Sequence, residues 1–338
     1  MALDLSRLPR DWGDPEREVR NCRTAAALFD FSFVARASIA GPAALSLIGR
    51  LTGRRLDDMT DGAIRYAVHA AANGRLVSDL TIWKRGPDIW EVMSGRPEDI
   101  AVLRDPPMPA ATVTDLSPAT SICAVQGPAT LSALAGLADT AALARLGYYR
   151  HRTATVAGID CLVGRLGYTG EAGFEIIAPR SAGQALWQAL AARIPPAGFA
   201  AADVLRIEAG FALFANEFQV PVTAAEAGLA SFAGPEGETA GEITLVCLTA
   251  SCRERPSVWQ PLTPPPRPTR AGEVAITSAG WSARAGGVLA LGFARTQDIA
   301  AGLPLHDPRG VLDRLARAGR PFYDPGKQRP RRAWHLPW

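Results

Sequence analysis

An internal repeat constrains the fold of this chain more than any other feature. The segments "SIAGPAALSLIGRL" (38–51) and "CAVQGPATLSALAGL" (123–137) each run from a short apolar stretch through Gly-Pro toward a helix. Pro42 and Pro128 suit a first helical turn, where a missing N–H costs little. Each copy continues as strand, turn, strand, turn, strand. The repeat predicts two pseudo-equivalent α+β halves that meet at a cleft, a common place for a small-molecule site.

The chain after the repeat has two further parts. "AADVLRIEAGFALF" predicts a helix with Val204, Ile207, Phe211 and Phe214 on one face. A proline-rich stretch at 253–272 then excludes helices and central strands. Short strands with Gly-rich turns follow and predict a small C-terminal β-barrel.

These patterns predict the domain boundaries. We expect a ligand-binding region at 1–235, with halves at about 27–120 and 121–235, a β-barrel at 240–328 and a basic tail at 329–338. The length of 338 residues, 48% of them hydrophobic, is ample for several packed units.

Composition excludes several classes of protein. The net charge is only +3 and the basic residues are spread among nearly as many acids, so nucleic acid is not expected as a partner. We find no apolar run of a signal peptide and no stretch of eighteen apolar residues, so we expect no membrane contact and a cytoplasmic protein.

No motif for a metal or a nucleotide occurs. The five cysteines include no C-x-x-C pair, the four histidines show no H-E-x-x-H spacing, and the glycine-rich fingerprints of nucleotide sites are missing. We expect free thiols and no bound metal.

Several motifs together resemble one family. "LGYTGEAGFEI", "ADVLRIEAGFALFANEF", "AVQGPA", the "DL" of "GRLVSDLTIW", "ITSAG" and "PFYDP" occur in the order found in the aminomethyltransferase (T-protein) family of the glycine cleavage system, which includes folate-dependent demethylases. The resemblance runs from about Ala27 to Pro325. It implies an α+β fold, a three-domain cloverleaf around a central hole that holds tetrahydrofolate, and one-carbon transfer to or from that cofactor.

Glu175 and Tyr168 are the expected pterin contacts. A carboxylate can accept both neighbouring N–H groups of an amino-pyrimidine edge, and Glu175 matches the pterin-binding glutamate of the family. Tyr168 stands in a Gly-rich turn that would expose its ring for stacking or hydrogen bonding. The alternative for Glu175 is a side chain that points to solvent from an edge strand.

Asp79 is the expected catalytic residue. The resemblance implies that it lies beside the reacting folate nitrogen, orients the cofactor and stabilises positive charge in the transition state. Its alternative role is to cap a turn. Many family members read Asp-Asp-Leu where this chain reads Ser78-Asp79-Leu80, which leaves the substrate open.

Three more residues are candidate cofactor contacts. Tyr66 and Trp83 fall where the family has cofactor-contacting aromatic residues, and ordinary strand core is the alternative for each. The guanidinium of Arg206 could reach the glutamate tail of folate, or it could pair with Asp203 three residues before it.

The predicted function is that of a tetrahydrofolate-dependent methyl- or methylene-transferase, or a demethylase, acting on a small N-, O- or S-methylated or aminomethyl donor. The glycine-cleavage T-protein itself, with a lipoyl carrier protein as partner, is one alternative. Another is a non-catalytic folate-binding or iron–sulfur assembly protein, although the "KGCYxGQE"-like motif of that branch is missing. A subunit of an amine-oxidising complex is the third.

Overall fold

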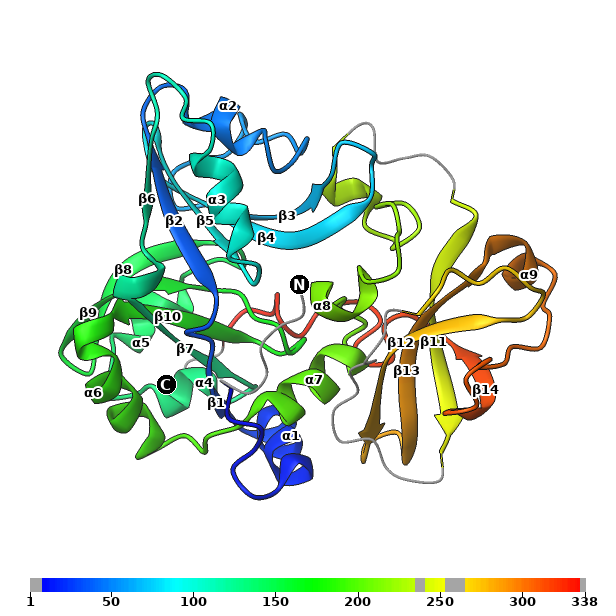
Figure 1. The fold of residues 1–338 in the computed structure, drawn as a ribbon. Helices are drawn as coiled ribbons and strands as arrows, with labels where there is room; N and C mark the ends of the chain where they lie inside the picture. The colour runs from blue at the N-terminus through cyan, green and yellow to red at the C-terminus, as the bar shows by residue number, and fades with distance from the viewer. Residues whose placement is uncertain (1–7, 235–240, 253–264, 335–338) are drawn as a thin grey trace.

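The structure, a computed structural model, describes residues 8–234, 241–252 and 265–334. Three antiparallel sheets surround a central region that contains the helices α7 (Phe199–Glu208) and α8 (Phe214–Glu217) (Figure 1). This α+β architecture agrees with the predicted fold class. No helix in these described ranges is long and apolar enough to cross a membrane.

The first two sheets have the same strand order, which confirms the repeat. The first sheet runs β3-β4-β5-β2-β6 and the second runs β8-β9-β10-β7-β1. The strands of the first sheet are β2 (Ala35–Ala40), β3 (Ile64–Ala70), β4 (Leu76–Gly86), β5 (Ile89–Ser94) and β6 (Thr112–Asp115). Those of the second are β1 (Ala27–Asp30), β7 (Thr120–Gln126), β8 (His151–Val156), β9 (Ile159–Gly164) and β10 (Gly173–Pro179).

One strand crosses between the halves. β1 lies in the range expected for the first half, yet it pairs with β7 of the second sheet, Ala27 opposite Gln126. The fifth strand of the second sheet therefore precedes the first copy of the repeat, which ties the two halves together.

Helices cover the outer face of each of these sheets. The first sheet carries α2 (Ala44–Ile48) and α3 (Glu98–Arg104), and α6 (Arg180–Ala191) packs on β7 and β10. Short helices α4 (Thr130–Ala133) and α5 (Thr140–Ala144) follow the second Gly-Pro turn. Both prolines precede their helices rather than starting them, because Gly41 (φ +122°) and Gly127 (φ +137°) place a left-handed turn there.

The inner faces of the two sheets meet in one core. Ile64, Trp83 and Met93 of the first sheet pack with Ala124 and Leu162 of the second. Side chains alternate along a strand. The residues of β4 and β10 that do not face the covering helices therefore point into this interior. The helix α1 (Pro15–Thr24) lies against α7 at the edge of this region.

The predicted helix over 201–214 is too long. α7 ends at Glu208, and Gly210 adopts φ +66°, so the chain turns before α8 begins at Phe214. A left-handed glycine just past the last helical residue is a frequent helix terminator. Phe211 and Phe214 therefore do not continue the apolar face of α7.

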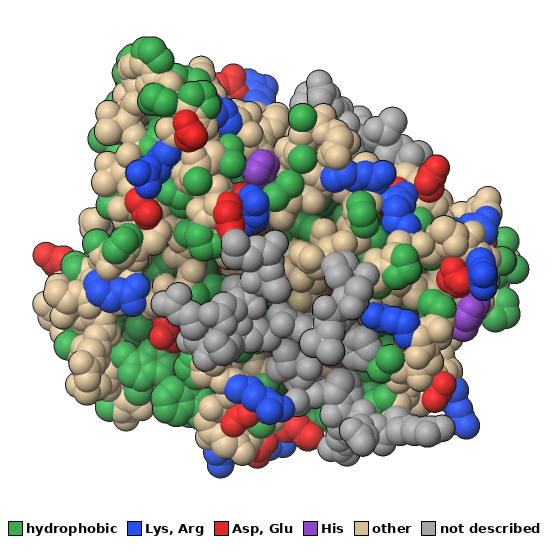
Figure 2. Space-filling view, viewed as in Figure 1, with side chains coloured by type: hydrophobic (Ala, Val, Ile, Leu, Met, Phe, Trp, Pro, Cys, Tyr) green, Lys and Arg blue, Asp and Glu red, His purple; other side chains and the backbone are tan. Residues whose placement is uncertain are grey.

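The C-terminal region forms a third sheet in the order β12-β13-β11-β14. Its strands are β11 (Ile243–Ser251), β12 (Val274–Ser282), β13 (Gly287–Arg295) and β14 (Asp313–Ala318), with the helix α9 (Thr296–Ala300) after β13. Closure of this sheet into the predicted barrel is not confirmed. On the face shown in Figure 2, basic and acidic side chains are interspersed over the described surface.

Candidate functional site

Asp79 lies on the inner face of the first sheet beside Tyr66. Its neighbours Leu80 and Ile82 belong to the helix-covered core, so the Asp79 side chain points the other way. The Tyr66 hydroxyl donates a hydrogen bond to the Asp79 carboxylate. Burial raises the pKa of Asp79 to about 6, even though the Tyr66 hydrogen bond acts to lower it. Asp79 is thus a half-buried carboxylate that is mostly ionised at neutral pH.

Glu175 lies on the inner face of the second sheet, in its interior. Its strand β10 runs between β7 and β9, with Glu175 opposite Ala124 and Gly164. The alternative of an edge strand is therefore wrong. The carboxylate is half-buried, and in the described part of the chain it takes part in no hydrogen bond or ion pair. Burial alone raises its pKa to about 7.

Tyr149 lies near both carboxylates, and sequence reasoning missed it. Burial raises the pKa of its phenol, and the nearby negative charges of Glu175 and Asp79 raise it further. Its backbone accepts a hydrogen bond from Ile64 N (2.8 Å) and donates one to Arg165 O (2.9 Å), so it bridges the two halves. The backbone of Tyr149 adopts a left-handed conformation (φ +59°), which sets the direction of its side chain. Tyrosine rarely adopts this conformation, so the sequence does not predict it.

Tyr168 is half-buried near Asp79. Its hydroxyl donates to Ala212 O at 2.7 Å, and its ring stacks on Phe211 with centroids 6.2 Å apart. Burial raises its pKa, the Arg206 cation acts against that shift, and the Asp79 charge adds to it. The turn leaves the ring half-buried against the core rather than exposed, and the hydroxyl is used inside the protein. Phe211 covers one face of the ring.

Trp83 lies on the same inner face of β4 as Asp79, in the core between the two sheets. Its side chain is fully buried, its Nε1 donates to Thr81 Oγ1 at 2.9 Å, and its ring lies against the backbone of Gly164. Gly164 pairs with Glu175 and both point to the same face of the sheet, so the indole packs on the side of that carboxylate. These contacts are those of an ordinary core residue in a strand, which was the alternative to a cofactor contact.

Arg206 sits inside the protein. It is fully buried, donates to Asp203 Oδ1 from Nε (2.9 Å) and NH2 (2.8 Å), and donates to Glu217 Oε2 from NH1 (2.9 Å). A further bond runs to Ser278 Oγ at 2.5 Å. The structure thus shows the alternative role, an ion pair between Arg206 and Asp203, and this pair is buried rather than exposed on a helix surface. A guanidinium engaged in this way is not placed to hold a folate tail.

The predicted site residues therefore fall into two groups. Asp79, Tyr66, Tyr168 and Glu175 keep exposed surface around one interior region, to which the structure adds Tyr149. Trp83 and Arg206 are fully buried in the packing around that region. The arrangement offers two carboxylates with raised pKa values and three aromatic rings, which suits a flat ligand with N–H donors.

Comparison with known proteins gives one family match. The family model described as the GCVT N-terminal domain matches residues 9–235. A protein of Moorella thermoacetica named "Aminomethyltransferase" is 35% identical over 228 residues, covering 65% of this chain and 61% of that relative. One of Streptomyces coelicolor with the same name is 32% identical over 260 residues, covering 74% of this chain and 70% of the relative. The match thus spans less than two thirds of the Moorella relative.

The fold has a counterpart among solved structures. The crystal structure of glycine cleavage system aminomethyltransferase T from Bartonella henselae matches with a TM-score of 0.67 over 84% of this chain and 82% of that chain. Sequence identity in this match is 23%, so the similarity concerns the fold alone.

Proposed function

Because this chain belongs to the aminomethyltransferase family defined by the GCVT domain, as its motifs predict, we propose that it transfers a one-carbon unit between a small donor and tetrahydrofolate. The observation that carries the proposal is the carboxylate of Glu175. This half-buried carboxylate accepts no hydrogen bond from the described residues. It lies near Tyr149, which also lies near Asp79.

The residues present fit tetrahydrofolate. A carboxylate held away from water is costly unless it receives hydrogen bonds. The amino-pyrimidine edge of a reduced pterin offers two neighbouring N–H donors, which match the two oxygens of Glu175. The rings of Tyr168 and Tyr66 supply flat apolar surface for a flat ligand.

Asp79 is the residue proposed for the chemistry. When bound, tetrahydrofolate supplies the nitrogen that accepts or releases the one-carbon unit. The Asp79 carboxylate, held by the Tyr66 hydroxyl, stabilises positive charge as it develops in the transition state. With a pKa of about 6, its oxygens can also take up a proton and return it near neutral pH.

The neighbourhood of Asp79 explains the serine at position 78. Ser78 Oγ donates to Asp99 Oδ2 at 2.5 Å, and Asp99 is fully buried. An aspartate at 78 would place a like charge against Asp99, at a large cost. The second carboxylate of this region therefore comes from α3, and the Asp99 charge contributes to the raised pKa of Asp79. Ser78 thus faces α3 rather than the Asp79 side of the sheet, so the serine leaves the choice of donor open.

The glycine-cleavage reaction is the second candidate. It is favoured by the name "Aminomethyltransferase" shared by the Moorella and Streptomyces relatives. It would require a lipoyl carrier protein as partner, whereas a demethylase would act on a free small molecule.

One assay tests both candidates. The full chain is incubated anaerobically with tetrahydrofolate and, in turn, an N-methylated amine, an O-methylated phenol, a thioether and an aminomethyl-loaded lipoyl carrier. Methyl- and methylene-tetrahydrofolate are measured by mass spectrometry, with Asp79→Asn as the matched control. Product from a free donor supports the demethylase, and product only with the carrier supports the second candidate. Cofactor binding without product from any donor would contradict catalysis.

A further inference from the structure

A recess lies between the C-terminal sheet, the end of α7 and the segment 318–325. Its volume is about 380 Å³, within the range of about 300–1,000 Å³ typical of small-molecule sites. None of its lining residues belongs to the Asp79 and Glu175 region. The residues that matter here are Glu208, Ser282, Arg284, Leu289, Phe322 and Tyr323.

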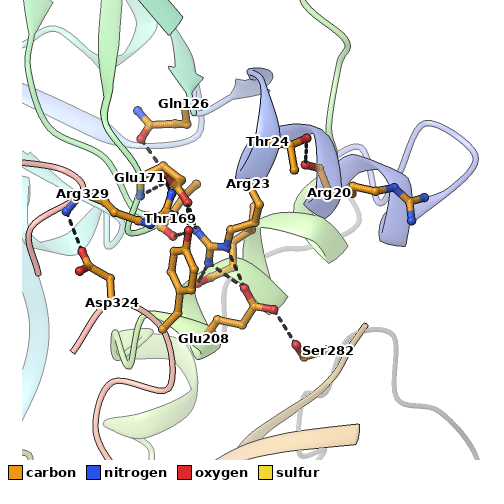
Figure 3. A network of polar contacts seen from close by, with 12 residues as sticks. Arg20, Arg23, Thr24, Gln126, Thr169, Glu171, Glu208, Ser282, Asp324 and Arg329 are labelled. Atoms are coloured by element: carbon orange, nitrogen blue, oxygen red, sulfur yellow. Dashed lines mark hydrogen bonds and ion pairs between the residues drawn. The ribbon is translucent and has the colours of Figure 1, made fainter. Parts of the chain in front are cut away.

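Glu208, Ser282 and Tyr323, which line this recess, belong to an ion-pair network that continues into the protein. Figure 3 shows this network from close by. Arg23 donates to Glu208 Oε2 from Nε at 2.9 Å and to Glu171 Oε1 from NH1 at 3.1 Å. The Tyr323 hydroxyl donates to Glu171 Oε1 at 2.7 Å, and Ser282 Oγ donates to Glu208 Oε1 at 2.7 Å.

The charges of this network balance. Glu171 Oε2 accepts from Arg329 at 3.3 Å, so each oxygen of Glu171 and Glu208 has a donor. Two carboxylates face two guanidiniums, those of Arg23 and Arg329. The network therefore has no net charge to attract or repel a ligand.

Arg284 adds an uncompensated positive charge. It is exposed, lines the recess, and has no carboxylate partner in the described ranges. Its guanidinium lies 4.5 Å from the centroid of the Tyr323 ring. Stacking on an aromatic ring limits the orientations of a guanidinium but leaves its N–H donors available.

We propose that this recess binds a small organic carboxylate. The carboxylate group pairs with the guanidinium of Arg284, whose forked donors match its two oxygens. The apolar body lies against Leu289 and Phe322, which line the recess. This site is separate from the proposed folate site and does not depend on it.

Benzoate is the probe for the test, and the full chain is used. Its dissociation constant is measured by ligand-observed NMR for the wild type, for Arg284→Gln and for Arg152→Gln, a matched change on the exposed face of β8. We expect saturable binding in the millimolar range (about −4 kcal/mol) to the wild type and to Arg152→Gln. Binding to Arg284→Gln, and binding of neutral benzamide to the wild type, should be at least about fivefold weaker.

A second variant tests the location. Gly319 lines the recess, and a Cβ added there meets no heavy atom within 4 Å. Gly319→Leu should therefore fold with an unchanged Tm and lose benzoate binding by filling the space. Equal binding of benzoate to the wild type, Arg284→Gln and Gly319→Leu would overturn the proposal. Absence of saturable binding to the wild type would overturn it too.

Discussion

Trp83 and His151 stack across the boundary between the two repeated halves, with ring centroids 5.3 Å apart and planes 30° from parallel. His151 Nε2 donates to Lys84 O at 2.9 Å, and its Nδ1 accepts from Arg85 NH1 at 3.2 Å. The contact at Nδ1 requires a neutral imidazole, because only an unprotonated ring nitrogen can accept a hydrogen bond. The boundary beside the proposed site is thus held by an uncharged histidine.

This stack predicts an acid-dependent loss of stability. Burial lowers the pKa of His151 to about 4, and the charges of Arg85 and Arg150 act in the same direction. In the unfolded chain the imidazole has a pKa near 6.5. The unfolded state therefore binds an extra proton between these values, and stability falls as the pH drops from about 6.5 toward about 4. Urea unfolding at pH 7 and pH 5 should show a smaller loss for His151→Phe than for the wild type.

The control for that experiment is His306→Gln, because His306 is exposed. Its loss of stability between the two pH values should equal that of the wild type. The same loss in His151→Phe as in the control would show that His151 is not the titrating group.

Gly164→Ala should disturb the packing beside Glu175. A Cβ at Gly164 would overlap the Trp83 ring, whereas one at Gly287 meets no heavy atom within 4 Å. Overpacking of a core costs about 1–3 kcal/mol, and Gly164 pairs directly with Glu175. We expect Gly164→Ala to lower both the free energy of unfolding and the affinity for tetrahydrofolate, and Gly287→Ala to change neither. If Gly164→Ala is destabilised but binds tetrahydrofolate with unchanged affinity, the packing of Trp83 does not affect the site.

Asp79→Asn should lower the rate and leave cofactor affinity within a few fold of the wild type. Loss of one preorganised electrostatic interaction commonly costs about 10² in rate. In the wild type the rate should rise as the pH increases through about 6, where Asp79 ionises. Steady-state kinetics against pH check this, with the active donor found by the product assay.

Tyr66→Phe provides the matching control for Asp79. The Tyr66 hydroxyl lowers the pKa of Asp79, so removing it should move the rise in rate to higher pH. A Tyr66→Phe profile that coincides with that of the wild type would assign the titration to another group.

Arg206→Met should destabilise the fold. It leaves Asp203 and Glu217 buried without their cation, and breaking a buried ion pair costs about 3–5 kcal/mol. Arg65→Met, which breaks a more exposed pair with Asp58, should cost about 1 kcal/mol or less. Urea unfolding compares the two. Weaker tetrahydrofolate binding by Arg206→Met, with unchanged stability, would instead support contact with the folate tail.

The sequence predicts the fold where one local pattern repeats. The two Gly-Pro segments give two sheets of the same strand order, and alternation along β4 and β10 puts Asp79 and Glu175 on inner faces. The pairing of β1 with β7 and the role of Tyr149 depend on contacts between distant segments. Such contacts leave no local pattern. Trp83 could not be assigned from the sequence for the same reason. The local sequence around a tryptophan in a strand is the same whether its ring contacts a ligand or packs on Gly164.

The most direct test of the account is calorimetric titration of tetrahydrofolate, under anaerobic conditions, into the wild type and Glu175→Gln at pH 8 and pH 6. Because the free carboxylate has a pKa of about 7 and only its ionised form accepts two N–H donors, affinity should fall with the pH. We predict micromolar binding by the wild type at pH 8 (about −8 kcal/mol), about tenfold weaker at pH 6. Glu175→Gln should bind at least about tenfold more weakly at pH 8, with little dependence on pH. Equal affinity of the two proteins at both pH values, or no binding by the wild type, would contradict the proposed folate site.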